Sequence, residues 1–170
     1  MKKGIIIALC SLAVMFAACK KSVEPTPEPI DYTPNYVGNY IGQFMFTITS
    51  MNNQAQTGMS FPIEDIRMDI TKGEKTNAIT ATVTVDNESH QTTGIASAEK
   101  IDFGTIPLSI DKPDQGYMFN LNLKMEGKKV DSDTLNVTGD FSGNGKFVFM
   151  GQENILEEVS GRMVGTLVKQ

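Results

Sequence analysis

The segment YMFNLNLKME, residues 117–126, decides the fold class of this chain. From Tyr117 to Met125 every second side chain is apolar, and most of the side chains between them are Asn or Lys. A period of two places the apolar side chains on one face of a β-strand and the polar ones on the other. Antiparallel sheets that cover a core with one face and meet water with the other have this pattern.

Similar alternation occurs on both sides of this segment, in runs that begin at Phe44, Ile66, Ile79, Leu135 and Met163. Turn-forming residues separate the runs, at Lys72-Gly73-Glu74, 112–116, Glu126-Gly127-Lys128 and Asn144-Gly145. The last pair predicts a tight hairpin, because Asn and Gly tolerate positive φ. The best candidate for a helical turn, or else a loop, is 152–158. We therefore expect an all-β domain: an antiparallel up-and-down barrel of about eight strands, or alternatively a two-sheet β-sandwich.

The N-terminal residues have the order of an export signal. Lys2 and Lys3 precede an apolar run, and the small residues Ala17 and Ala18 precede Cys19. The segment Phe16-Ala17-Ala18-Cys19 resembles the lipobox of bacterial lipoproteins, which implies cleavage before Cys19 and acylation of its thiol. We expect residues 1–18 to be a lipoprotein signal peptide; an ordinary secreted protein with a free Cys19 is the alternative.

Residues 19–34 follow as a proline-rich tether. Four prolines lie between Lys20 and Pro34, and proline favours extended, semi-rigid conformations. The tether predicts that a folded domain, residues 35–170, stands off the membrane. Placement on the periplasmic side and placement on the outer side both remain open.

Composition excludes several functions. The formal net charge is −5, and no basic run is present, which argues against nucleic-acid binding. One of the two cysteines, Cys10, lies in the expected signal peptide, so the domain itself has no thiol for disulfides, catalysis or zinc.

No catalytic motif is visible, so we expect no enzyme activity, no metal and no cofactor. His90 is the only histidine, and its polar neighbours predict a solvated side chain. The segment Asp131-Ser132-Asp133 lacks the remaining ligands of a calcium loop and predicts a solvated turn.

Three segments carry a family resemblance: Tyr36–Gly42, Leu135–Gly139, and Ser160–Leu167. Through them the domain resembles the calycin-like, lipocalin-related envelope lipoproteins of Bacteroidetes over 36–169. The resemblance implies a barrel closed by its first and last strands. It also implies a cation–π contact in which Arg162 packs over the ring of Tyr40, which takes the place of the lipocalin Trp.

The resemblance further implies location and function. We expect a non-enzymatic protein of the cell envelope, anchored in the outer membrane through Cys19. It would bind a small apolar or amphipathic ligand in a barrel mouth lined by Tyr40, Phe44, Phe46, Phe119, Leu121 and Phe147. The alternative is an interaction or scaffolding module that presents a surface to a partner protein or glycan. In the same kind of organism, Asp133-Thr134-Leu135 matches a short O-glycosylation sequon, which predicts a glycan on Thr134.

Overall fold

The structure is a computed structural model that describes residues 28–170. Within these residues the chain forms eight strands and two short 3-10 helices, in the order η1 (Thr33–Asn35), β1 (Gly38–Met51), β2 (Gln54–Lys72), β3 (Ala78–Val85), β4 (Glu88–Ala96), β5 (Ile101–Lys112), η2 (Pro113–Gln115), β6 (Tyr117–Lys129), β7 (Thr134–Phe149) and β8 (Gln152–Lys169). The described residues include no helix long and apolar enough to cross a membrane. The expected signal peptide, Cys19 and the first part of the tether lie outside the described residues.

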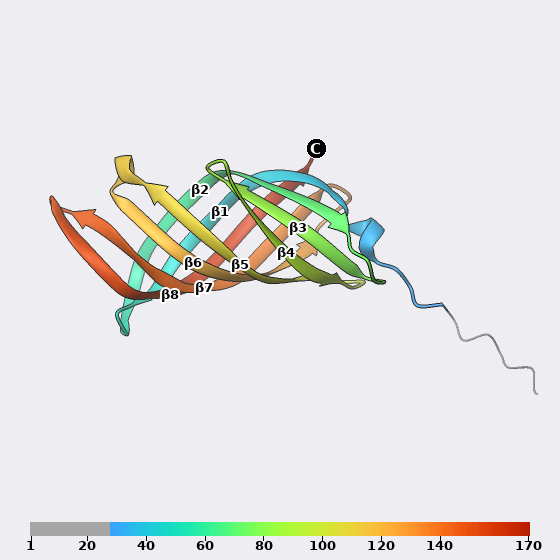
Figure 1. Ribbon diagram of the computed structural model, residues 1–170, viewed down its shortest axis with the longest axis horizontal. Helices are drawn as coiled ribbons and strands as arrows, with labels where there is room; N and C mark the ends of the chain where they lie inside the picture. The colour runs from blue at the N-terminus through green and yellow to red at the C-terminus, as the bar shows by residue number, and fades with distance from the viewer. Residues whose placement is uncertain (1–27) are drawn as a thin grey trace, which may run out of the picture.

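The strands form one closed antiparallel barrel (Figure 1). Each strand pairs with its neighbours in sequence, and β8 pairs with β1 over a ladder that runs from Tyr40 opposite Lys169 to Met51 opposite Val159. The predicted up-and-down barrel is therefore confirmed. The sandwich alternative is excluded, because the pairing of the first and last strands makes a single continuous sheet.

The alternating pattern of residues 117–126 is the inside–outside pattern of β6. Phe119, Leu121, Leu123 and Met125 are at most 3% exposed, whereas the intervening Asn120, Asn122 and Lys124 are exposed. The same phase continues across the ladders into β5 and β7. Buried apolar side chains from all eight strands form one core.

Three phenylalanines of the core lie over glycines on the neighbouring strand. Phe44 is opposite Gly165, Phe119 is opposite Gly145, and Phe141 is opposite Gly161. A Cβ atom added to any of these glycines would come within 2.6 Å of the facing ring. The missing side chains therefore make room for the rings, and large and small residues together fill the barrel.

Three hairpins turn at pairs of residues with positive φ: Asn52-Asn53, Asp86-Asn87 and Met150-Gly151. Such pairs match the twist of the flanking strands. The predicted hairpin at Asn144-Gly145 is wrong, because both residues lie inside β7, where Gly145 accommodates the Phe119 ring.

Two further sequence predictions need correction. Gly127 lies within β6, so the turn expected at Glu126-Gly127-Lys128 comes later, between β6 and β7. The segment 152–158 is the start of β8 and not a helical turn or loop. It pairs with the end of β7, from Gly145 opposite Leu156 to Phe149 opposite Gln152, and this pairing requires an extended chain.

The N-terminal residues close one end of the barrel, here called the capped end. Tyr36 is 1% exposed, and its hydroxyl donates to the carbonyl of Ser97 at 3.1 Å. The backbone N–H of Tyr32 donates to Asn77 at 2.7 Å, and Asp31 forms an ion pair with Lys72 at 2.5 Å. The last residues of the expected tether therefore contact the barrel.

The opposite end, here called the tip end, carries the turns β1–β2, β3–β4, β5–β6 and β7–β8 (Figure 1). Strand pairing is uneven towards this end. β2 pairs with β3 only from Arg67 onwards, and β4 pairs with β5 at only three positions, from Gly94 to Ala96. Parts of β2 and β5 near the tip end therefore lack a ladder partner on one side.

Candidate functional site

Five of the six residues predicted to line a ligand site belong to the packed core. Tyr40, Phe44 and Phe46 are at most 1% exposed, and Phe119 and Leu121 are each 3% exposed. A side chain that lines a cavity large enough for water retains surface accessible to water, so these five are packed against protein atoms. Phe147 is partly buried and lies near the tip end.

Among the side chains that the structure describes, four that are apolar and face inward remain partly exposed near the tip end, and we call them the mouth cluster: Met59, Phe61, Tyr117 and Phe147. Their inward orientation follows from register. Met59 is opposite Ile48 and Phe61 is opposite Phe46, both of which are buried; Tyr117 is opposite Phe147. The mouth cluster therefore continues the core to the tip end, where water reaches it.

Phe61 joins two sides of the barrel. Its ring stacks on Phe46 of the neighbouring strand β1 at a centroid distance of 5.4 Å and on Phe119 of β6 at 5.2 Å. It also contacts Tyr117 at 5.2 Å. β2 and β6 are not neighbours in the sheet, so the contact crosses the barrel interior. These rings pack together across the interior just below the tip end. Their partly exposed surfaces face the solvent at that end.

Polar groups surround the Tyr117 ring. Its hydroxyl donates to Gln115 at 2.8 Å. Lys112 lies directly opposite Tyr117 in the β5–β6 hairpin, and its ammonium group forms an ion pair with Asp86 of the β3–β4 turn. Burial raises the pKa of Tyr117, with Lys112 acting in the opposite direction. The β5–β6 hairpin thus holds the ring and hydroxyl of Tyr117 beside the ammonium group of Lys112.

The expected contact between Tyr40 and Arg162 is not formed. Arg162 is opposite Thr47 rather than Tyr40, and its side chain is exposed on the outer surface, whereas Tyr40 is buried inside. The two residues have opposite phases and are far apart along the β1–β8 ladder. Backbone pairing closes the barrel, and the Tyr40 hydroxyl instead donates to the carbonyl of Tyr36 at 2.8 Å.

The other predicted residues occupy structural positions or lie outside the description. Thr134 begins β7, and its backbone N–H donates to Asp131 at 2.7 Å. Asp131 also accepts from the backbone of Asp133, which lowers the pKa of its carboxyl group, so this segment is a capped turn. The glycan prediction for Thr134 stays a prediction. Cys19 lies outside the described residues.

His90 differs from the sequence expectation. It is opposite the buried Val83, and its side chain is only 20% exposed. Its Nε2 atom is buried and has no hydrogen-bond partner among the described residues; the nearest carboxylate oxygen, of Glu88, is 3.9 Å away. No group of three or more His, Cys, Asp or Glu side chains within 28–170 could hold a metal ion.

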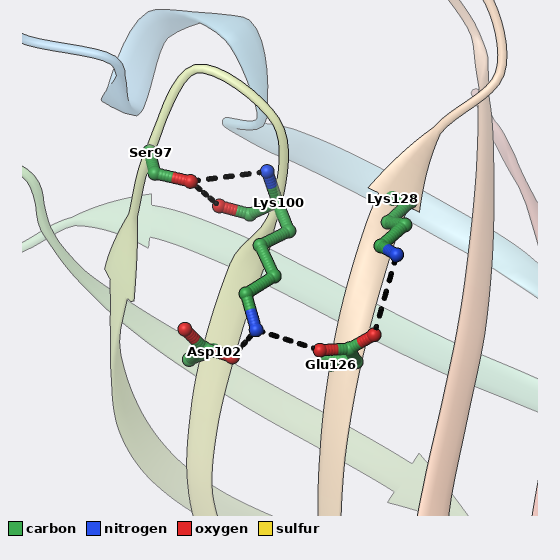
Figure 2. Close-up of polar contacts among 5 residues, drawn as sticks. All are labelled: Ser97, Lys100, Asp102, Glu126 and Lys128. Atoms are coloured by element: carbon green, nitrogen blue, oxygen red, sulfur yellow. Dashed lines mark hydrogen bonds and ion pairs between the residues drawn. The ribbon is translucent and has the colours of Figure 1, made fainter.

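A charged network lies near the capped end (Figure 2). The ammonium group of Lys100 contacts Asp102 and Glu126, each at 2.8 Å, and Ser97 holds the backbone of Lys100. These contacts raise the pKa of Lys100, chiefly through Asp102, and the hydrogen bond from Lys100 lowers the pKa of Glu126. Both shifts favour the charged forms of Lys100 and Glu126, which suits a structural tie between the β4–β5 loop and β6 rather than proton transfer.

Sequence reasoning missed Met59, Phe61 and Tyr117 as candidate site residues. Tyr117 belongs to the segment that decided the fold class, but its exposure depends on its place as the first residue of β6, at the tip end. Phe61 precedes Pro62, and a register shift lies between Gly42 and Phe44 on the paired strand, so simple alternation does not identify its face. The contact of Phe61 with β6 is visible only in three dimensions.

No protein-family model and no curated protein matches the chain. A solved structure of a DUF3598-family protein of unknown function from Nostoc punctiforme PCC 73102 is similar, with 10% identity over 86% of this chain and 53% of that protein and a TM-score of 0.46. This chain thus spans about half the length of that protein. EF1p2_mFAP2b bound to DFHBI is similar with 16% identity over 82% of this chain and 97% of that one, and a TM-score of 0.41. Neither similarity carries a conclusion about function.

Proposed function

We propose that this chain is a lipid-anchored, non-enzymatic barrel protein of the cell envelope that binds a small apolar or amphipathic ligand at the mouth cluster. The observation that carries the ligand-binding part is the change in exposure along the barrel interior. Core aromatic residues such as Phe44 and Phe46 are fully buried, whereas Phe61, Tyr117 and Phe147 continue the same inward phase but remain partly exposed.

Partly exposed aromatic rings at the end of a packed core favour ligand binding. When a ligand covers apolar surface that was in contact with water, the free energy falls by about 25 cal/mol per Å². Small-molecule sites are mostly apolar with a few polar groups that orient the ligand. The mouth cluster with the Tyr117 hydroxyl and Lys112 has this composition. A filled interior below it means that the ligand lies on the rings rather than deep in the barrel.

Fluorescence titration with N-phenyl-1-naphthylamine, a neutral aromatic probe, tests the binding site. The full chain has a matched pair of methionines: Met59 in the mouth cluster is 39% exposed, and Met45 on the outer face is 38% exposed. We expect Met59→Ala and Phe61→Ala to weaken probe binding severalfold, and Met45→Ala to leave it unchanged. Equal effects of Met59→Ala and Met45→Ala, or no binding by the parent protein, would overturn this part of the proposal.

Metabolic labelling with a fatty-acid analogue tests the anchor. The formal net charge of −5 argues against attachment to anionic lipid through basic side chains, so membrane attachment would depend on acylation of Cys19. We expect Cys19→Ala to abolish labelling and to move the protein out of the membrane fraction. Cys10→Ala is the matched control and should retain both. Unlabelled parent protein would contradict the anchor without affecting the probe titration.

A further inference from the structure

An ion pair connects the β5–β6 hairpin, which carries Tyr117 of the mouth cluster, to the β3–β4 turn. Lys112 ends β5, and its side chain is on the same side of the hairpin as Tyr117, directly across the ladder. Its ammonium group contacts the carboxylate of Asp86, which belongs to the turn between β3 and β4. β4 and β5 have no ladder pair beyond Gly94 and Phe103, so this ion pair joins the two hairpins where backbone pairing has ended.

The ion pair is accessible to a competing anion. The side chains of Lys112 and Asp86 are 29% and 38% exposed. Asp86 lies in a turn of positive φ, which an Asp tolerates without strain, so the turn itself does not require the contact with Lys112. Partly exposed ion pairs contribute little net stability, and exchange of one carboxylate for another therefore costs little.

Lys112 is also the positive charge best placed for the mouth cluster. Within the described residues, Lys112 is the lysine or arginine at an inward-facing position nearest the tip end. The charged residues near it, Asp86 and Glu88, are acidic. A neutral apolar ligand would leave Lys112 on Asp86. A ligand with an acidic group would place its rings or chain on Phe61 and Tyr117 and its charge beside the ammonium group.

We propose that the ligand is an amphipathic anion, an aromatic or alkyl acid, whose acidic group replaces Asp86 on the ammonium group of Lys112. In the unliganded protein the Asp86 carboxylate occupies the position of the ligand's acidic group. Binding therefore releases the β3–β4 turn from β5. This inference rests on the proposed ligand site and adds the chemical class of its ligand.

Two probes that share a ring system separate this inference from the proposed function. 1-Anilinonaphthalene-8-sulfonate differs from N-phenyl-1-naphthylamine by one sulfonate group, so the ratio of their affinities measures the contribution of the negative charge. In the full chain the sulfonate gains the contact with Lys112 that Asp86 loses, so we expect the two probes to bind within about twofold of each other. Salt should reduce the preferences that the variants below create.

Variants of the ion pair give opposite predictions although both remove the same contact. Lys112→Met should make the sulfonate bind severalfold more weakly than the neutral probe, because Asp86 then repels it, and should leave binding of the neutral probe within twofold. Asp86→Asn should make the sulfonate bind about fivefold more tightly than the neutral probe. Lys124→Met, which removes an exposed lysine from the outer face of β6, is the control and should change neither affinity.

The possible results are distinguishable. If the neutral probe binds at the mouth cluster but Lys112→Met and Asp86→Asn change the affinity ratio in the same direction or not at all, the inference is wrong and the proposed function stands. If neither probe responds to Met59→Ala or Phe61→Ala, the proposed site itself is wrong.

Discussion

At the scale of single residues, glycines determine how the barrel is filled. Gly165 faces inward beneath the Phe44 ring, and a Cβ atom there would lie 2.4 Å from that ring and 2.8 Å from the backbone oxygen of Gln43. Gly127 also faces inward in a strand, but its nearest neighbours are the side chains of Leu135 and Phe103 at 3.2 Å. The two glycines therefore differ in how much the surroundings must move to admit a methyl group.

We expect Gly165→Ala to lower the free energy of unfolding by about 1–3 kcal/mol, because the Phe44 ring and the backbone must shift in a close-packed interior. Gly127→Ala should cost clearly less, because flexible side chains can adjust by a few tenths of an ångström. Urea unfolding of both variants measures the difference. Equal losses would show that the ring-over-glycine pair has no special role.

These pairs also mark what sequence alone does not provide. Alternation in β6 predicts which side chains face inward, and it did so correctly for Phe119 and Leu121. It does not predict that Phe119 lies opposite Gly145, because that depends on register between strands. The candidate site was not predictable for a similar reason. Phe61 and Phe119 lie on strands that are not neighbours, and their rings meet across the barrel interior.

At the scale of elements, the capped end is held by two buried tyrosines. Tyr36 contacts the β4–β5 loop and Tyr40 contacts the carbonyl of Tyr36. Burial is the main reason that the pKa of each phenol is raised, with Glu99 acting in the same direction on Tyr36 and Asp133 on Tyr40. The folded chain therefore holds these protons more tightly than the unfolded chain does.

This linkage predicts a loss of stability at alkaline pH. Because the folded-state pKa values are raised, the contribution is complete below the unfolded pKa of about 10 and is lost as pH rises through and above that value. Tyr40→Phe should lower stability near neutral pH by about 1 kcal/mol through the lost hydrogen bond. It should also make the alkaline decline shallower. Thermal unfolding between pH 7 and pH 11 measures both effects, and an unchanged alkaline slope would contradict the assignment.

Turns are the elements that sequence patterns located least well. The segment Asn144-Gly145 has turn-forming residues but lies within β7, because the ladder with β6 pairs both residues and the ladder with β8 resumes at Gly145 after a register shift. The real turn, Met150-Gly151, includes a methionine at a φ of 52°. Local propensity was overridden by the pairing of the neighbouring strands, and the start of β8 was mistaken for a helical turn or loop for the same reason.

At the scale of the whole molecule, the barrel is closed unevenly. The β7–β8 ladder extends from Thr134 to Phe149, whereas β4 and β5 share three paired positions. Beyond them, the Thr92 hydroxyl reaches the carbonyl of Thr105 at 3.4 Å and the Asp86–Lys112 ion pair joins the ends. These two side-chain contacts join β5 to β4 and to the β3–β4 turn where the β4–β5 ladder has ended.

We expect the barrel to open first between β4 and β5. Amide hydrogen exchange followed by mass spectrometry should show faster exchange in 104–112 than in 134–143, because half of the β5 amides there have no ladder acceptor. Asp86→Asn should increase the exchange of 104–112 further and leave 134–143 unchanged. Uniform protection of the two segments would contradict the prediction.

The two ends of the barrel differ: within the described residues, the capped end is covered by the chain, and the tip end is not. The described chain enters the barrel beside η1, and the mouth cluster lies at the far end, so the two are separated by the length of the barrel (Figure 1). A group bound at the capped end would therefore leave the aromatic rings of the mouth cluster uncovered. Contacts made at the capped end and exchange of a ligand at the mouth cluster would not obstruct each other.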